Sequence, residues 1–95
     1  MMRKTVHFNK TGIERLPDDK PVVYKIQTKG GSNNYTGVAK TGRVQERIGE
    51  HLRSGKDPVP GAKVQIEQVP TIAEAKQRER AIIGRDQPPH NKNHK

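Results

Sequence analysis

Two short β-prone stretches on either side of a glycine-rich turn constrain the fold of this chain most. Val22 to Gln27 is rich in β-branched residues, which favours a strand, and Asn34 to Ala39 is predicted to be a second strand. Residues 28–33 between them include two glycines and an asparagine, which tolerate positive φ. We therefore predict an antiparallel hairpin, in which Tyr24 and Tyr35 can lie close together across the pair.

The middle of the chain predicts a helix, a loop and a third strand. Arg43 to Leu52 has an apolar residue at every fourth position, which is typical of a helix with one buried face. Two prolines and two nearby glycines make residues 56–61 a loop. Ala62 to Val69 alternates apolar and polar residues, as a half-buried strand does.

A second helix is predicted near the end of the chain. Thr71 and Glu74 form a capping-box pattern that opens it, and it runs to about Ile83 with Gly84 as the C-cap. The tail at residues 88–92 begins with two prolines, so we do not expect it to be helical at its start.

These elements predict a small α/β domain of the α+β kind, a three-stranded antiparallel sheet flanked by helices. Residues 1–20 are expected to form an N-terminal arm, irregular or with a short helical turn. Three isolated apolar residues of the arm would pack onto the domain: Phe8, Ile13 and Leu16. Residues 21–95 are expected to form a single domain, which is the default for a chain of 95 residues.

Charge narrows the classes of partner. With 19 Lys and Arg against 10 Asp and Glu, the formal net charge is +9, which favours a polyanion such as nucleic acid over a merely soluble basic protein. The absence of cysteine excludes disulfides and any zinc site built on thiolates. No apolar run is long enough for a signal peptide or a membrane span, so we expect a cytoplasmic protein.

The rarity of aromatic residues makes the two tyrosines informative. The chain has three aromatic side chains, and Tyr24 and Tyr35 are two of them. A phenol has an apolar ring and a hydroxyl that needs a partner when buried. The pair can therefore form either a site or a small core.

Three polar residues on the predicted helices are candidate partners for the tyrosines. Arg47 and His51 are four residues apart, so they share a helix face beside the apolar stripe. The structural alternative is an arginine that extends to solvent and a histidine satisfied at the boundary of the core. Glu79 falls in the middle of an apolar helix face, where a carboxylate needs a cation: either a metal ion, or a structural partner such as Arg47 or Lys25.

Taken in chain order, these residues resemble the GIY-YIG nuclease domain. Its two signature triads are matched by Val22-Val23-Tyr24 and Tyr35-Thr36-Gly37, with valine in place of the first glycine and threonine in place of the isoleucine. The resemblance extends from about residue 21 to residue 92 and matches four further family positions. They are the catalytic arginine at Arg47, a histidine of part of the family at His51, the metal-binding glutamate at Glu79 and a late asparagine at Asn91.

The resemblance implies a metal-dependent endonuclease that hydrolyses DNA. Tyr24 would activate water, as a phenolate or through a hydrogen bond, and a phenolate would need positive charge from Arg47 and a metal ion. Arg47 would bind the phosphate oxygens, and Mg²⁺ or Mn²⁺ on Glu79 would stabilise the leaving oxygen. The other implied roles are orientation by Tyr35 and His51, support of Glu79 by Asn91, and nucleic-acid contacts by Lys25, Lys40 and Arg43.

Two other functions stay open at this point. One is a nucleic-acid-binding module that keeps the fold without cutting, and the other is a nuclease for RNA or branched structures. Because no separate recognition domain is evident in the sequence, specificity could also come from a homodimer or from a separate specificity protein.

Overall fold

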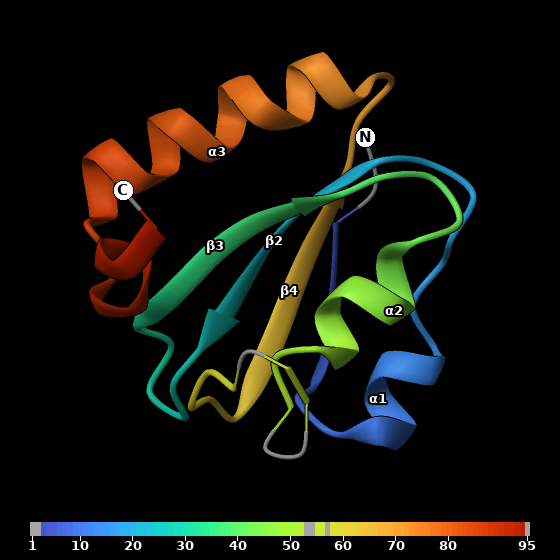
Figure 1. The fold of residues 1–95 in the computed structure, drawn as a ribbon. Coiled ribbons are helices and arrows are strands. Elements are labelled where there is room, and N and C mark those ends of the chain that lie inside the picture. The colour runs from blue at the N-terminus through green and yellow to red at the C-terminus, as the bar shows by residue number, and fades with distance from the viewer. Residues whose placement is uncertain (1–2, 53–54, 57, 95) are drawn as a thin grey trace.

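The computed structural model describes residues 3–52, 55–56 and 58–94, which form an α+β domain built on an antiparallel sheet (Figure 1). Four strands lie in the order β1-β4-β2-β3, so β1 and β3 are the outer strands. In chain order the elements are β1 (Arg3–His7), α1 (Lys10–Glu14), β2 (Val22–Gln27), β3 (Asn33–Ala39), α2 (Val44–Gly49), β4 (Lys63–Gln68), α3 (Ile72–Asp86) and the 3-10 helix η1 (Pro89–His94).

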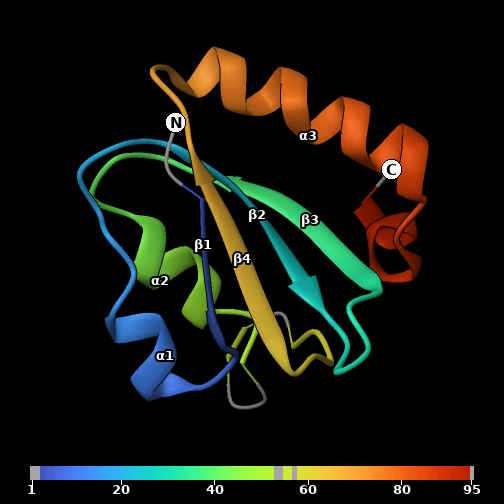
Figure 2. The same cartoon turned by 180° about the vertical axis from the view of Figure 1, so that it is seen from behind.

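The sheet separates two helical layers (Figures 1 and 2). Alternate residues of a strand point to opposite faces, and Tyr24 of β2 belongs to the core on the side of α1 and α2. Its neighbour Lys25 lines a cavity on the other side together with residues of α3. A residue's place in this alternation therefore decides which helical layer it meets.

One apolar core lies between the sheet and the helices α1 and α2. Ile13 and Leu16 of the N-terminal segment are buried in it, and Phe8 packs against it half-buried, as predicted. The core also contains residues from β2, β3, β4 and α2, so a chain with only 28% hydrophobic residues concentrates them on one face of the sheet. Among the described helices, none has both the length and the apolar character needed to cross a membrane.

The predicted hairpin is confirmed. Tyr24 pairs with Gly37 and Ile26 pairs with Tyr35, so the tyrosines are diagonal neighbours on one face of the β2–β3 pair. Gly31 in the turn has φ +95, a conformation that glycine adopts without strain.

The prediction of a three-stranded sheet was wrong, because the N-terminal segment supplies a fourth strand. β1 pairs with β4, with Arg3 opposite Glu67 and Val6 opposite Val64. Within β1 only Val6 is apolar, so the segment has too weak an alternation to reveal a strand by itself. The segment becomes a strand because its backbone pairs with the edge of β4. The expected helical turn is present as α1.

The first predicted helix is shorter than expected and is capped from a distance. α2 ends at Gly49, and residues 50–52 follow it as a turn, with the backbone N–H of His51 bonded to the carbonyl of Ile48 at 3.0 Å. The side chain of Arg43, the N-cap residue of α2, makes no capping hydrogen bond to the helix. Instead the carboxylate of Asp18 accepts a hydrogen bond of 2.7 Å from the N–H of Val44.

The second predicted helix is longer than expected. The Thr71 hydroxyl accepts from the N–H of Glu74 at 3.1 Å, which confirms the predicted N-terminus. The helix continues through Gly84 to Asp86, and Gln87, with φ 46, is its C-cap. The tail was expected not to be helical at its start, and Pro88 lies outside any helix, but η1 begins one residue later at Pro89, because a fixed φ suits a proline at a first helical position.

Candidate active site

Tyr24 is the centre of the candidate site. Its side chain is fully buried, and its hydroxyl lies 2.8 Å from Nε2 of His51. Gly37, opposite on β3, leaves the room for the phenol, because a Cβ at Gly37 would lie 2.6 Å from the Tyr24 oxygen. The hairpin register and the absence of a side chain at Gly37 therefore place this hydroxyl under the end of α2.

The two tyrosines and His51 pack as a cluster of three rings. The ring centroid of His51 lies 4.5 Å from that of Tyr35 and 5.8 Å from that of Tyr24, and the tyrosine centroids are 6.2 Å apart. All three side chains are buried. The tyrosines can therefore belong to the core and to a site at the same time, because the same rings fill the core and bring the Tyr24 hydroxyl to His51 Nε2.

Arg47 connects the buried cluster to solvent. Its side chain is 51% exposed and forms an ion pair of 3.3 Å with Glu50. The charge of Arg47 also acts on the Tyr24 hydroxyl and lowers the pKa of the phenol. A guanidinium can donate to a buried phenol and still present other N–H groups outward.

The pKa of Tyr24 is nevertheless raised well above its ordinary value. Burial is the main cause, the neighbouring Tyr35 phenol adds to it, and the charge of Glu79 adds a smaller amount, which together outweigh Arg47. The charge of Arg47 favours a Tyr24 phenolate, as expected, but its effect on the pKa is smaller than the effect of burial. At neutral pH the group is a neutral phenol that shares a hydrogen bond with His51.

Glu79 acts on the same phenol from α3. It is half-buried and lies one turn after Ala75, which is fully buried. Of its expected structural partners, Lys25 lies 4.0 Å from Asp86, and Arg47 pairs with Glu50. Glu79 comes from the helical layer opposite α2, yet its charge reaches Tyr24.

A single carboxylate is compatible with Mg²⁺, which uses one or two protein carboxylates and keeps several waters. Among the described residues, no group of three or more histidines and carboxylates is close enough to enclose a metal ion. An ion at Glu79 would therefore have to be held by one side chain, water and substrate oxygens.

Asn91 is buried and fixes the tail to the outer strand. Its Oδ1 accepts from the N–H of Thr36 at 2.7 Å, and its Nδ2 donates to the carbonyl of Thr36 at 2.9 Å. The side chain thus holds the backbone of β3, the strand that carries Tyr35.

The predicted nucleic-acid contacts lie in two separate places. Lys40 and Arg43 line the same cavity as Arg47, whereas Lys25 points to the α3 side and pairs with Asp86. The sequence reasoning did not select Lys76, which lines this cavity from α3. The available signal was its place in line with Ile72 and Glu79, four and three residues away on one helix face.

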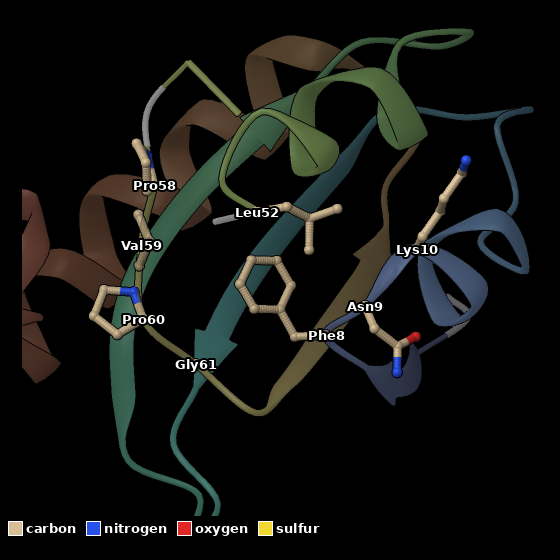
Figure 3. Close-up of a pocket in the computed structure, with 8 residues that line it drawn as sticks. All are labelled: Phe8, Asn9, Lys10, Leu52, Pro58, Val59, Pro60 and Gly61. Carbon is tan, nitrogen blue, oxygen red and sulfur yellow. The ribbon is translucent and has the colours of Figure 1, made fainter. Parts of the chain in front are cut away.

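A larger cavity lies away from these residues (Figure 3). Its volume is about 900 Å³, and its lining is mainly apolar, with Phe8, Leu52 and Val59 among the residues that form it. Size alone does not locate the chemistry, because Tyr24, Arg47 and Glu79 do not line this groove.

No protein-family model matches the chain, and no curated protein matches it in sequence.

Proposed function

We propose that this protein is a divalent-metal-dependent endonuclease of the GIY-YIG type that hydrolyses DNA phosphodiester bonds. The observation that carries the proposal is the bond of 2.8 Å between the buried Tyr24 hydroxyl and His51 Nε2, with Arg47 acting on the same hydroxyl. This phenol is bonded to a histidine, and the charge of a half-exposed arginine also acts on it. That arrangement links a proton acceptor to a phosphate-binding group.

In this proposal Tyr24 works as a neutral phenol. Its oxygen accepts the proton of the attacking water while its own proton passes to His51 Nε2, so no phenolate has to form first. The water oxygen bonds to phosphorus, the bond to the leaving oxygen breaks, and that oxygen takes a proton from solvent. Tyr35 holds the His51 ring in place by direct packing.

The charge of the phosphate is met by Arg47 and a metal ion. The planar fork of Arg47 matches two nonbridging oxygens, and its half-exposed position allows it to reach them. Glu79 would hold Mg²⁺ or Mn²⁺, which supplies stabilisation of negative charge on the leaving oxygen. DNA as the substrate is supported by the net charge of +9 and by Lys40 and Arg43 beside Arg47.

A second function is favoured by one specific observation. Tyr24 is fully buried and its pKa is raised, as expected for a phenol that only completes a core. A nucleic-acid-binding module with this fold would keep the basic surface and would not cut.

Plasmid nicking separates the two functions. We expect wild-type protein to nick supercoiled DNA with Mg²⁺ and not with EDTA, and Tyr24→Phe, Arg47→Ala and Glu79→Ala each to lose at least about 100-fold in rate. Arg80→Ala is the matched control, since Arg80 is an exposed arginine beside Glu79 and should retain activity. Circular dichroism establishes that each variant is folded.

The outcomes are distinct. Equal inactivity of all proteins, with DNA binding intact, would refute the nuclease and leave the binding module. Activity on RNA or branched DNA in place of plasmid would keep the chemistry and change the substrate.

A further inference from the structure

A small basic cavity lies where α2 and α3 approach the end of the outer strand β3. Its volume is about 240 Å³. Four of its lining residues are cationic and none is acidic, and the cations come from three separate places in the chain: Lys40 after β3, Arg43 and Arg47 around α2, and Lys76 on α3. We call these four residues and the space between them the basic cavity.

The charge of the basic cavity is only partly neutralised by the protein. Arg43 pairs with Glu46 and Arg47 pairs with Glu50, both at the exposed surface of α2. Within the described part of the chain, neither Lys40 nor Lys76 forms an ion pair with a carboxylate. Converging cations without matching acids repel one another, so an anion in the cavity would lower the energy of the arrangement.

The size of the basic cavity restricts the anion. Sites for drug-sized ligands occupy about 300–1,000 Å³, so 240 Å³ suits a small anionic group better than a whole nucleoside. Phosphate oxygens are the natural partners of lysine and arginine together.

The basic cavity adjoins the candidate active site on both sides. Arg47 belongs to both, and Lys76 precedes Glu79 by three residues, so it lies on the same face of α3. A strand whose scissile phosphate meets Arg47 would therefore pass its neighbouring phosphate between α2 and α3.

We propose that the basic cavity binds a backbone phosphate adjacent to the cleaved one, and that Lys76 is a substrate-binding residue for it. The inference rests on the proposed function for its ligand, a nucleic-acid strand, but not on cleavage of that strand. Lys40 contacts the phosphate from the end of β3 and Lys76 from α3, so the substrate bridges the outer strand and α3.

The test is the salt dependence of DNA binding, measured with the full chain in EDTA. Fluorescence anisotropy of a labelled duplex between 50 and 200 mM salt gives the slope of log affinity against log salt, which changes by about 0.9 for each phosphate contact. We expect Lys76→Gln to make the slope shallower by about one contact. Glutamine is a helix former like lysine, so α3 should persist.

Lys29→Gln is the matched control. It removes the same charge from an exposed lysine in the turn between β2 and β3, at the opposite end of β3 from Lys40. We expect Lys29→Gln to change the slope much less than Lys76→Gln, and Lys76→Arg to behave as wild type. Equal slopes for the two glutamine variants would overturn the proposal.

A competition arm identifies the source of the phosphate. Inorganic tripolyphosphate should displace the duplex from wild type only at a large excess. It can occupy the basic cavity alone, whereas a DNA strand contacts the protein through several phosphates. Tight binding of tripolyphosphate without binding of DNA would also overturn the proposal. If Lys76→Gln alone makes the salt dependence shallower and wild-type protein does not nick plasmid DNA, the nuclease proposal is refuted and the phosphate site in the basic cavity is retained.

Discussion

Gly37→Ala is the substitution that tests the geometry of the candidate site most directly. A Cβ at this position would lie 2.6 Å from the Tyr24 oxygen, 2.7 Å from its Cζ and 3.0 Å from Cε1 of Tyr35. The first of these distances is about 0.8 Å short of the 3.4 Å at which ordinary contact begins. Tyr24 is fully buried, so its ring can move only by displacing the core around it.

The cost follows from two effects. Overpacking a core typically costs 1–3 kcal/mol, and a strained buried hydrogen bond to His51 adds about 1 kcal/mol. We therefore expect Gly37→Ala to lower the free energy of unfolding by about 2–4 kcal/mol, which is a large part of the stability of a small domain. At about 4–8 °C per kcal/mol for a domain of this size, the midpoint should fall by roughly 10 °C or more.

Thermal and urea unfolding measure this loss, and Gly84→Ala provides a control of opposite sign. Gly84 lies within α3, and a Cβ there would meet no atom within 4 Å. The same change should therefore stabilise the protein by about 0.5–1 kcal/mol through helix propensity.

Two results decide whether the geometry is right. If Gly37→Ala unfolds within about 0.5 kcal/mol of wild type, the usual range for surface changes, the close approach of Tyr24 to β3 does not exist as described. If the geometry holds, Tyr24→Phe should partly relieve the strain, because it removes the atom nearest to the new methyl group. The double-mutant cycle should then show coupling between the two positions.

Three further predictions concern the surroundings of the site. Asn91→Ala should cost about 1–3 kcal/mol in chemical denaturation, because two backbone groups of buried Thr36 lose their partner. The pKa of Tyr24 is raised in the folded state. The free energy of unfolding should therefore fall as pH rises above about 10, by up to about 1.4 kcal/mol per pH unit. If the free energy of unfolding of Tyr24→Phe depends on pH in the same way, the phenol is not the cause of this dependence. Lys25→Gln should leave DNA affinity almost unchanged while Lys40→Gln weakens it severalfold, and similar losses in anisotropy titrations would show that both faces bind.

The parts of the fold that depend on neighbouring residues could be predicted from the sequence. The β2–β3 hairpin follows from its turn and its β-branched residues, and the start of α3 follows from Thr71 and Glu74. The parts that were missed depend on distant partners. β1 becomes a strand because β4, some 60 residues later, offers it an edge, and α2 is capped by Asp18 from 26 residues away.

The candidate site divides in the same way. Strand alternation brings Tyr24 and Tyr35 to one face of the sheet, and the same rule places Lys25 on the other face. The pKa of Tyr24 could not be foreseen, because the burial that raises it is produced by the packing of α2 and the turn at His51. Lys76 was missed because a lone lysine on a helix is usually solvated, and only the approach of α3 to β3 brings it beside Arg47.

The attachment of Asn91 to Thr36 also bears on association between chains. β3 is an outer strand, and an outer strand with unpaired backbone groups is a template for pairing with another chain. The carboxamide of Asn91 occupies both the N–H and the carbonyl of Thr36, in the middle of that edge. Loss of Asn91 would therefore expose a length of strand able to add a foreign strand, so aggregation, and not only unfolding, is the expected fate of the variant on storage.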